Sequence, residues 1–248
     1  MLIAASLTLV IAGFLLTAPI PQDPAYHQFA DSRTLFAVNN FWNIASNLPF
    51  LIIGLWGLWY VHKYGEATCL SGLQPAYSVF FAGIFLTAFG SCYYHLIPEN
   101  GPLVWDRLPM TIGFAGLFSI IIGEFVSVRG GRRLLLPLLV IGVASVVYWA
   151  VTEARGAGDL RPYVAVQFLP MMLIPVVLLT CKPSIGHARY YWLMMLVYVL
   201  AKLFEFADAA IYDAGLLISG HTLKHLFASI VPATMLYALM ARRRRDQL

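Results

Sequence analysis

The chain has 248 residues, of which 60% are hydrophobic and only 11% are charged, whereas about a quarter of the residues in soluble domains are charged. Its formal net charge of +4 does not indicate nucleic-acid binding, because four of its 16 Lys and Arg residues form the C-terminal run 242–245. Such a run is expected to anchor the last helix at an anionic membrane face. The composition therefore predicts an integral membrane protein without a nucleic-acid partner.

Hydrophobic stretches of about 20 residues, long enough to cross a bilayer as a helix, recur along the chain. In chain order they cover residues 2–20, 40–61, 74–96, 107–127, 134–152, 162–181, 189–212 and 221–241. Helices are expected throughout, because backbone groups in lipid must be hydrogen-bonded within their own segment.

The predicted fold is all-α, a multi-pass bundle of seven transmembrane helices over residues 34–245, preceded by an extra hydrophobic segment over 1–22. This first segment has no basic start, so we expect an extra helix, with a cleaved signal peptide as the alternative. The sequence does not indicate an oligomeric state.

The distribution of Lys and Arg predicts the orientation of the bundle. With the C-terminus in the cytoplasm, ten basic residues fall on the inner side and four on the outer side. The inner ones are Lys63, Arg129, Arg132, Arg133, Lys182, Arg189 and 242–245, and the outer ones are Arg33, Arg107, Arg155 and Arg161.

Five polar residues fall at one depth in this topology, near the outer leaflet. Ser91 and His95 lie at the end of the third span, Asp106 precedes the fourth, and His221 and His225 open the last. Both pairs have i, i+4 spacing, which places each pair on one helix face. Two histidines one turn apart can bind one metal ion, and a third from another helix gives the three ligands of a catalytic zinc site.

Each of these residues also has a plainer interpretation. The histidines could lie at the membrane edge, Ser91 could bond to its own helix, and Asp106 could be the N-cap of the helix that follows. The functional interpretation is preferred because ionisable groups in membrane spans are costly and usually functional.

A second charged cluster is expected within the seventh segment. Lys202 and Glu205 are three residues apart and predict an ion pair. Asp208 is a candidate partner for a metal-bound histidine.

Four motifs, in order, resemble the alkaline ceramidases, within the wider seven-helix hydrolase superfamily that includes the adiponectin receptors. They are 41-FWNIASNLPFLIIG-54, 90-GSCYYH-95, 106-DRLPM-110 and 221-HTLKH-225. The resemblance covers about residues 40–241.

The resemblance implies a zinc ion bound by His95, His221 and His225, with Asp106 orienting and deprotonating water and Ser91 stabilising the oxyanion. It implies a zinc-dependent hydrolase of the outer (periplasmic or lumenal) leaflet. Such an enzyme would cleave the amide bond of ceramide-like N-acyl lipids to a free fatty acid and an amine.

Two positions depart from the family pattern. Asn40 stands where animal members carry an acidic residue of a calcium site, and Asp31 is the one plausible oxygen ligand upstream, so the support for calcium is weak. Arg107 replaces an acidic residue beside Asp106, which leaves the head-group preference open.

Other classes of membrane protein are the alternatives. A seven-helix receptor-like or cofactor-binding protein could carry retinal on Lys224 or Lys202, and a haem protein could use paired histidines. His221 and His225, however, share one helix face, whereas two axial haem ligands come from facing helices. A transporter would spread polar residues through both leaflets, whereas here they gather in one.

Overall fold

The computed structural model describes residues 12–13, 16–215 and 217–245, and in these ranges its regular structure is helical. The extra helix predicted over 2–20 lies mostly outside the described residues. The elements, in chain order, are η1 (Pro24–His27), α2 (Phe41–Ala45), α3 (Leu48–Thr68), α4 (Gln74–Leu96), α5 (Asn100–Phe125), α6 (Val128–Ala154), α7 (Arg161–Thr180), α8 (Ala188–Phe206), α9 (Asp208–Asp213) and α10 (Gly220–Arg245).

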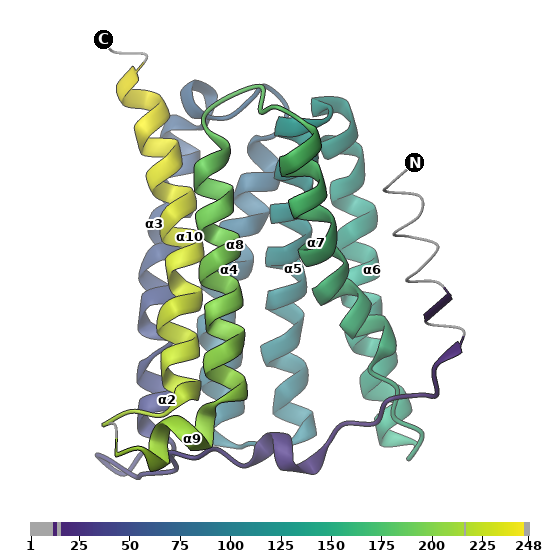
Figure 1. The fold of residues 1–248 in the computed structure, drawn as a ribbon, viewed down its shortest axis with the longest axis vertical. Coiled ribbons are helices and arrows are strands. Elements are labelled where there is room, and N and C mark those ends of the chain that lie inside the picture. The colour runs from purple at the N-terminus through teal and green to yellow at the C-terminus, as the bar shows by residue number, and fades with distance from the viewer. Residues whose placement is uncertain (1–11, 14–15, 216, 246–248) are drawn as a thin grey trace.

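Seven of these helices are long and run side by side, with α2 and α9 at the end of the bundle opposite the C-terminus (Figure 1). Among the described residues, six helices are long and apolar enough to cross a membrane. They are Phe41–Thr68, which joins α2 and α3, and α4, α5, α6, α7 and α10. The long helix α8 is not among them and carries Arg189, Lys202 and Glu205.

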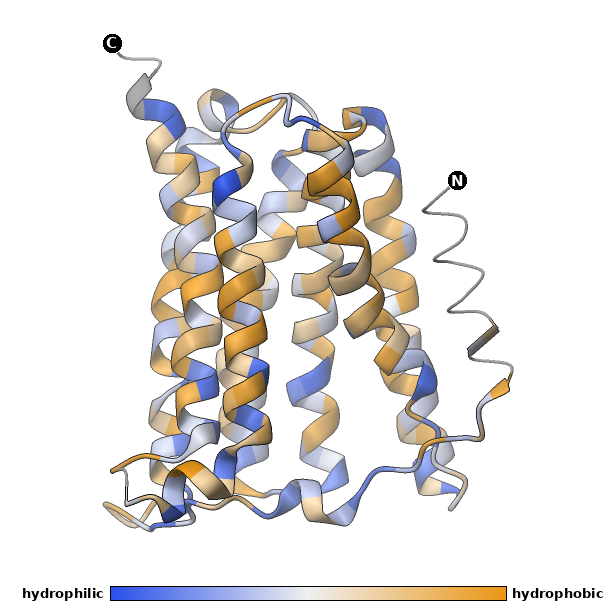
Figure 2. Cartoon of the chain, viewed as in Figure 1, coloured by the Kyte–Doolittle hydropathy of each residue, from blue (hydrophilic) through white to orange (hydrophobic). Residues whose placement is uncertain are grey.

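The outer surface of the bundle is apolar along much of its length. Hydrophobic residues cover the middle of the helices, and polar residues concentrate toward the ends (Figure 2). Large apolar side chains such as Leu55, Trp56, Leu136 and Val140 are half exposed or more in the described part of the chain. An apolar surface of this extent matches contact with lipid rather than water, so the chain is a multi-pass membrane protein.

Two predicted boundaries are wrong. The fourth span begins at Asn100 with Glu99 as its N-cap residue, so Asp106 lies in the second turn of α5 and is not an N-cap. The extended backbone of Glu99 and its carbonyl, which accepts from Leu103 N at 3.1 Å, start the helix earlier. The segment predicted as 189–212 is broken at Ala207 into α8 and α9.

At the C-terminal end of the bundle, an ion pair is buried between α5 and α10. Arg242 Nη1 and Nη2 donate to Glu124 Oε1 and Oε2 at 2.7 and 2.9 Å, and both side chains are almost fully buried. The hydroxyls of Tyr77 on α4 and Tyr191 on α8 also donate to Glu124. Arg242 therefore joins four helices, and the expectation that it only anchors the chain at the membrane face is wrong for this residue.

Candidate metal centre

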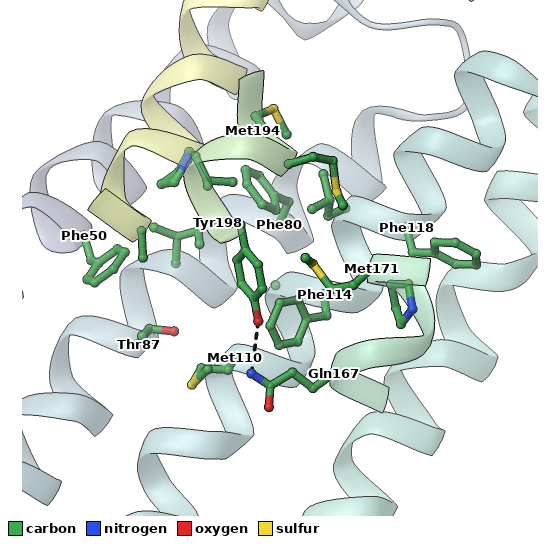
Figure 3. A pocket seen from close by; sticks show the side chains of 18 of the residues that line it. Phe50, Phe80, Thr87, Met110, Phe114, Phe118, Gln167, Met171, Met194 and Tyr198 are labelled. Atoms are coloured by element: carbon green, nitrogen blue, oxygen red, sulfur yellow. Dashed lines mark hydrogen bonds between the residues drawn. The ribbon is translucent and has the colours of Figure 1, made fainter. Parts of the chain in front are cut away.

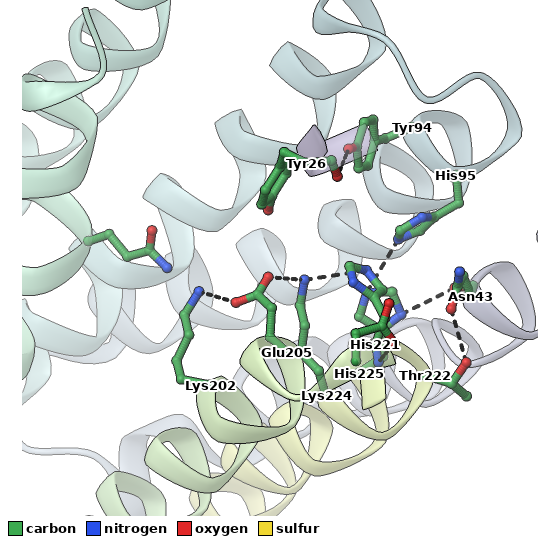
Figure 4. A network of polar contacts seen from close by, with 12 residues as sticks. Tyr26, Asn43, Tyr94, His95, Lys202, Glu205, His221, Thr222, Lys224 and His225 are labelled. Carbon is green, nitrogen blue, oxygen red and sulfur yellow. Dashed lines mark hydrogen bonds and ion pairs between the residues drawn. The ribbon is translucent and has the colours of Figure 1, made fainter. Parts of the chain in front are cut away.

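The three predicted histidines meet at the end of the bundle opposite the C-terminus (Figure 4). His95 comes from the last turn of α4, and His221 and His225 come from the first two turns of α10. Their exposed fractions are 1%, 6% and 4%. One nitrogen from each ring lies within 4.8 Å of the others, so the group could hold a metal ion. The prediction that these residues converge is confirmed.

The spacing of one pair of ring nitrogens fits a shared ion. His95 Nε2 lies 3.4 Å from His225 Nε2. Two nitrogens that each lie about 2.0–2.1 Å from a tetrahedral zinc ion are separated by about 3.4 Å. His95 Nδ1 is buried without a hydrogen-bond partner in the described part of the chain. Buried polar atoms usually have a partner, so the polar contact of this ring is the one that Nε2 makes toward His225.

The α2 region orients His225. Its Nδ1 lies 3.1 Å from the carbonyl oxygen of Asn43 and 2.8 Å from Ser46 Oγ. A carbonyl can only accept, so Nδ1 carries the proton and the lone pair is on Nε2, which faces His95. Asn43 also accepts from Thr222 Oγ1 at 3.0 Å, which joins α2 to α10 beside the site.

The backbones of the other two histidines are also held in place. Asn40 Nδ2 donates to the carbonyl oxygen of His95 at 2.9 Å. Asp208 Oδ1 accepts from His221 N at 2.7 Å. Asp208 was considered as a partner for a metal-bound histidine, and its contact is with the backbone N of His221 and not with the imidazole ring.

Ser91 and Asp106, the predicted catalytic residues, are both buried. Ser91 lies one turn before His95 on α4. Together with His225, Ser91 and Asp106 line a cavity. Much of its wall is apolar, including Phe80, Phe114 and Met194 (Figure 3). Asp106 and Ile121, 15 residues apart on α5, both line it, so the cavity follows about 22 Å of that helix at 1.5 Å per residue.

The close contact of α4 and α5 depends on Gly90. A Cβ atom on this glycine would lie 1.9 Å from the carbonyl oxygen of Trp105 and 3.2 Å from the Cα atom of Asp106.

We expect Gly90→Ala to separate the helices at the site, to destabilise the protein by about 1–3 kcal/mol and to lower metal retention. Thermal unfolding and metal content in detergent measure both effects. Gly101→Ala is the matched control, since no atom lies within 4 Å of the added Cβ, and equal behaviour of the two variants would contradict the prediction.

A segment before α2, residues 17–31, crosses the site end of the bundle; we call it the outer strap (Figure 1). The ring of Phe29 packs over the histidines, with its centroid 4.7 Å from that of His95 and 4.8 Å from that of His221. The strap is fixed at Ala30, whose N donates to Asp208 Oδ2 at 3.0 Å, and at His27, whose Nδ1 lies 3.0 Å from Tyr94 OH. It therefore covers His95 and His221 at this end of the bundle.

Asp31 and Asn40, the positions considered for calcium, have other partners. Arg33 Nη2 lies 2.6 Å from Asp31 Oδ2. Burial by itself would raise the pKa of Asp31, but hydrogen bonds from Arg33 outweigh it and keep the pKa below its ordinary value. The side-chain amide of Asn40 faces His95, as described above.

Arg107 points away from the reactive groups. Its guanidinium lies 4.1 Å from the ring centroid of Trp149 and 4.7 Å from that of Tyr163. Its Nη2 donates to Gln22 Oε1 of the outer strap at 2.7 Å. Arg107 therefore contacts α6, α7 and the strap.

Three contributors to the site were not assigned by sequence reasoning. Asn43 and Ser46 orient His225, and Phe29 covers the histidines. The signal for the first two was the polar spacing inside 41-FWNIASN-47, whose asparagines and serine recur at i, i+3 and i+4 in an apolar helix. Nothing in the sequence around Phe29 indicates its role.

No protein-family model matches the chain, and no curated protein matches it significantly. Fold and site together define a helical, multi-pass membrane protein with a buried three-histidine centre that could hold a metal ion.

Proposed function

We propose that the protein is a zinc-dependent intramembrane hydrolase that cleaves the amide bond of N-acyl lipids of the ceramide type. The products are a free fatty acid and an amine. One observation carries the proposal: His225, one of three buried imidazoles that could hold a metal ion, lines an apolar cavity whose wall also contains the Asp106 carboxylate and the Ser91 hydroxyl.

Zinc suits this donor set, because three imidazole nitrogens with no fourth protein ligand are typical of catalytic zinc sites. His95, His221 and His225 would hold the ion. When bound, zinc would supply Lewis acidity, which polarises a carbonyl group and makes water a better nucleophile.

Asp106 would act as the general base. Its carboxylate would take a proton from the attacking water as the C–O bond forms, and would then pass this proton to the amide nitrogen as the C–N bond breaks and the amine leaves. Ser91, one turn from His95 on α4, would donate a hydrogen bond from its hydroxyl group to the carbonyl oxygen on which negative charge develops. One water is consumed, and one carboxylic acid and one amine are released.

The cavity suits an acyl chain. Its wall contains apolar side chains such as Phe80, Phe114, Met171 and Met194 (Figure 3). Its length along α5 exceeds half of a hydrocarbon core of about 30 Å, so a chain that fills one leaflet can lie in it. The predominance of Lys and Arg near the C-terminal end favours a reaction at the outer leaflet.

The test is fatty-acid release from N-acyl lipids by the purified, zinc-loaded protein. We expect Asp106→Asn to retain zinc and to lose about 100-fold or more in kcat, the effect of a missing general base. We expect Ser91→Ala to lose on the order of 100-fold, the effect of one missing oxyanion donor. An unaltered protein that holds zinc and releases no fatty acid, or an Asp106→Asn variant of full activity, would overturn the proposal.

A further inference from the structure

The cavity beside the histidines contains one cation among its described lining residues, Lys224 (Figure 4). It lies on α10 between His221 and His225, and its Nζ is 3.5 Å from His221 Nε2. An amide held at the three histidines would therefore lie close to this ammonium group. The side chain is 17% exposed and lines the same cavity as Asp106.

The ion-paired cluster of Lys224, Lys202 and Glu205 has more positive than negative charge. Glu205 on α8 is shared by two lysines: its Oε1 accepts from Lys224 Nζ at 2.7 Å and its Oε2 from Lys202 Nζ at 2.6 Å. One carboxylate thus faces two ammonium groups. Asp106 is the carboxylate among the described lining residues of the cavity, and its charge would be lost when it takes up a proton in the proposed reaction. Buried charges need compensation, so a further negative charge near Lys224 would be favourable.

The charge of the hydrolysis products also favours a substrate that carries a negative charge. Cleavage of a neutral N-acyl amine leaves an amine that becomes a cation beside two lysines. An amino acid product carries its own carboxylate, which offsets that charge. In an N-acyl amino acid the carboxylate carbon is two bonds from the amide nitrogen, so it would lie next to the amide and within reach of Lys224.

We propose that Lys224 determines head-group specificity by binding a carboxylate next to the amide, so that the preferred lipids are N-acyl amino acids. The cleavage of these lipids rests on the proposed function, whereas their recognition does not. An ammonium–carboxylate contact in a site of low water content is stronger than a contact with a hydroxyl group.

The experiment compares two ligands with the same acyl chain and the same amide, N-oleoylglycine and N-oleoylethanolamine. Binding is measured by titration calorimetry on the full-length, chelator-treated protein in detergent. Removal of metal prevents both hydrolysis and direct binding of the carboxylate to an ion. We expect the unaltered protein to bind the glycine conjugate about 10-fold or more tightly than the ethanolamide. Lys224→Met should lose this preference while its affinity for the ethanolamide changes little, and Lys224→Arg should retain it.

The controls separate specificity from folding and from catalysis. Lys63→Met removes an exposed lysine on α3, far from α10's first turn, and should keep the preference. If Lys224→Met does not bind the ethanolamide, Lys224→Gln takes its place. Equal binding of the two lipids by the unaltered protein, or a preference that survives in the neutral variants, would overturn the inference. Absence of fatty-acid release from the zinc-loaded protein, with the binding preference intact, would overturn the proposed function alone.

Discussion

Purified protein carrying His221→Ala is expected to lose the zinc that the unaltered chain retains. Removing one of three ligands leaves two imidazoles, and loss of even an outer partner of a ligand typically weakens a metal site by about 10–100-fold, so the direct loss should exceed 100-fold. Elemental analysis of untagged protein should give about one zinc per unaltered chain, as one three-histidine site requires, and close to none for the variant. Fatty-acid release should disappear with the metal.

His62→Ala controls for adventitious metal, because His62 is exposed on α3 and lies outside the cluster. Its zinc content should equal that of the unaltered chain. Ser46→Ala gives a graded comparison: all three ligands remain, but the Ser46 contact with His225 Nδ1 is lost, so affinity should fall by about 10–100-fold. A well-folded unaltered protein without metal, or equal zinc in His221→Ala, would contradict the assignment.

Replacing Arg242 by methionine is expected to destabilise the protein by about 3–5 kcal/mol, the usual cost of leaving one member of a buried ion pair without its partner. Glu124 is 0% exposed and, among the described side chains, would be left with the hydroxyls of Tyr77 and Tyr191 as donors. The midpoint of thermal unfolding in detergent should fall by roughly 10 °C for a chain of this size.

Two comparisons test the reason for this effect. Arg243→Met removes a charge from the same arginine run, but Arg243 lies over the ring of Tyr64 and is not part of the pair, so a small change is expected. The double variant Glu124→Gln with Arg242→Met should be more stable than Arg242→Met alone, because it removes the uncompensated charge. If the two arginine variants unfold at the same temperature, the buried pair does not stabilise the bundle in the way described.

The two ends of the bundle have different roles in this structure. The Glu124–Arg242 pair joins helices α4, α5, α8 and α10 at the C-terminal end, where no histidine of the cluster lies. The same four helices carry Ser91, Asp106, Glu205 and the histidines at the opposite end. A polar contact that fixes one end of these helices helps to define their spacing at the other.

Much of the site was predictable because the information is local. A run of about 20 apolar residues defines a membrane helix, since its length must match the hydrocarbon core. The i, i+4 spacing then places Ser91 with His95, and His221 with His225, on common faces. The alternation of direction from span to span places these faces at one depth. The prediction of Asp106 near the histidines used the same reasoning, although its helix starts earlier than expected.

The remaining features were decided by tertiary structure, because helices that are apolar on all sides do not show which faces meet. The contact between Ser46 and His225 joins residues 179 positions apart, and that between Glu124 and Arg242 joins residues 118 apart. No periodicity indicates such pairs. The sequence by itself determined that this protein lies in a membrane, with a cluster of side chains that could bind a metal ion at one depth. Only the packing of the helices decided which imidazole nitrogens face each other, that Phe29 covers them, and that Lys224 faces the cavity.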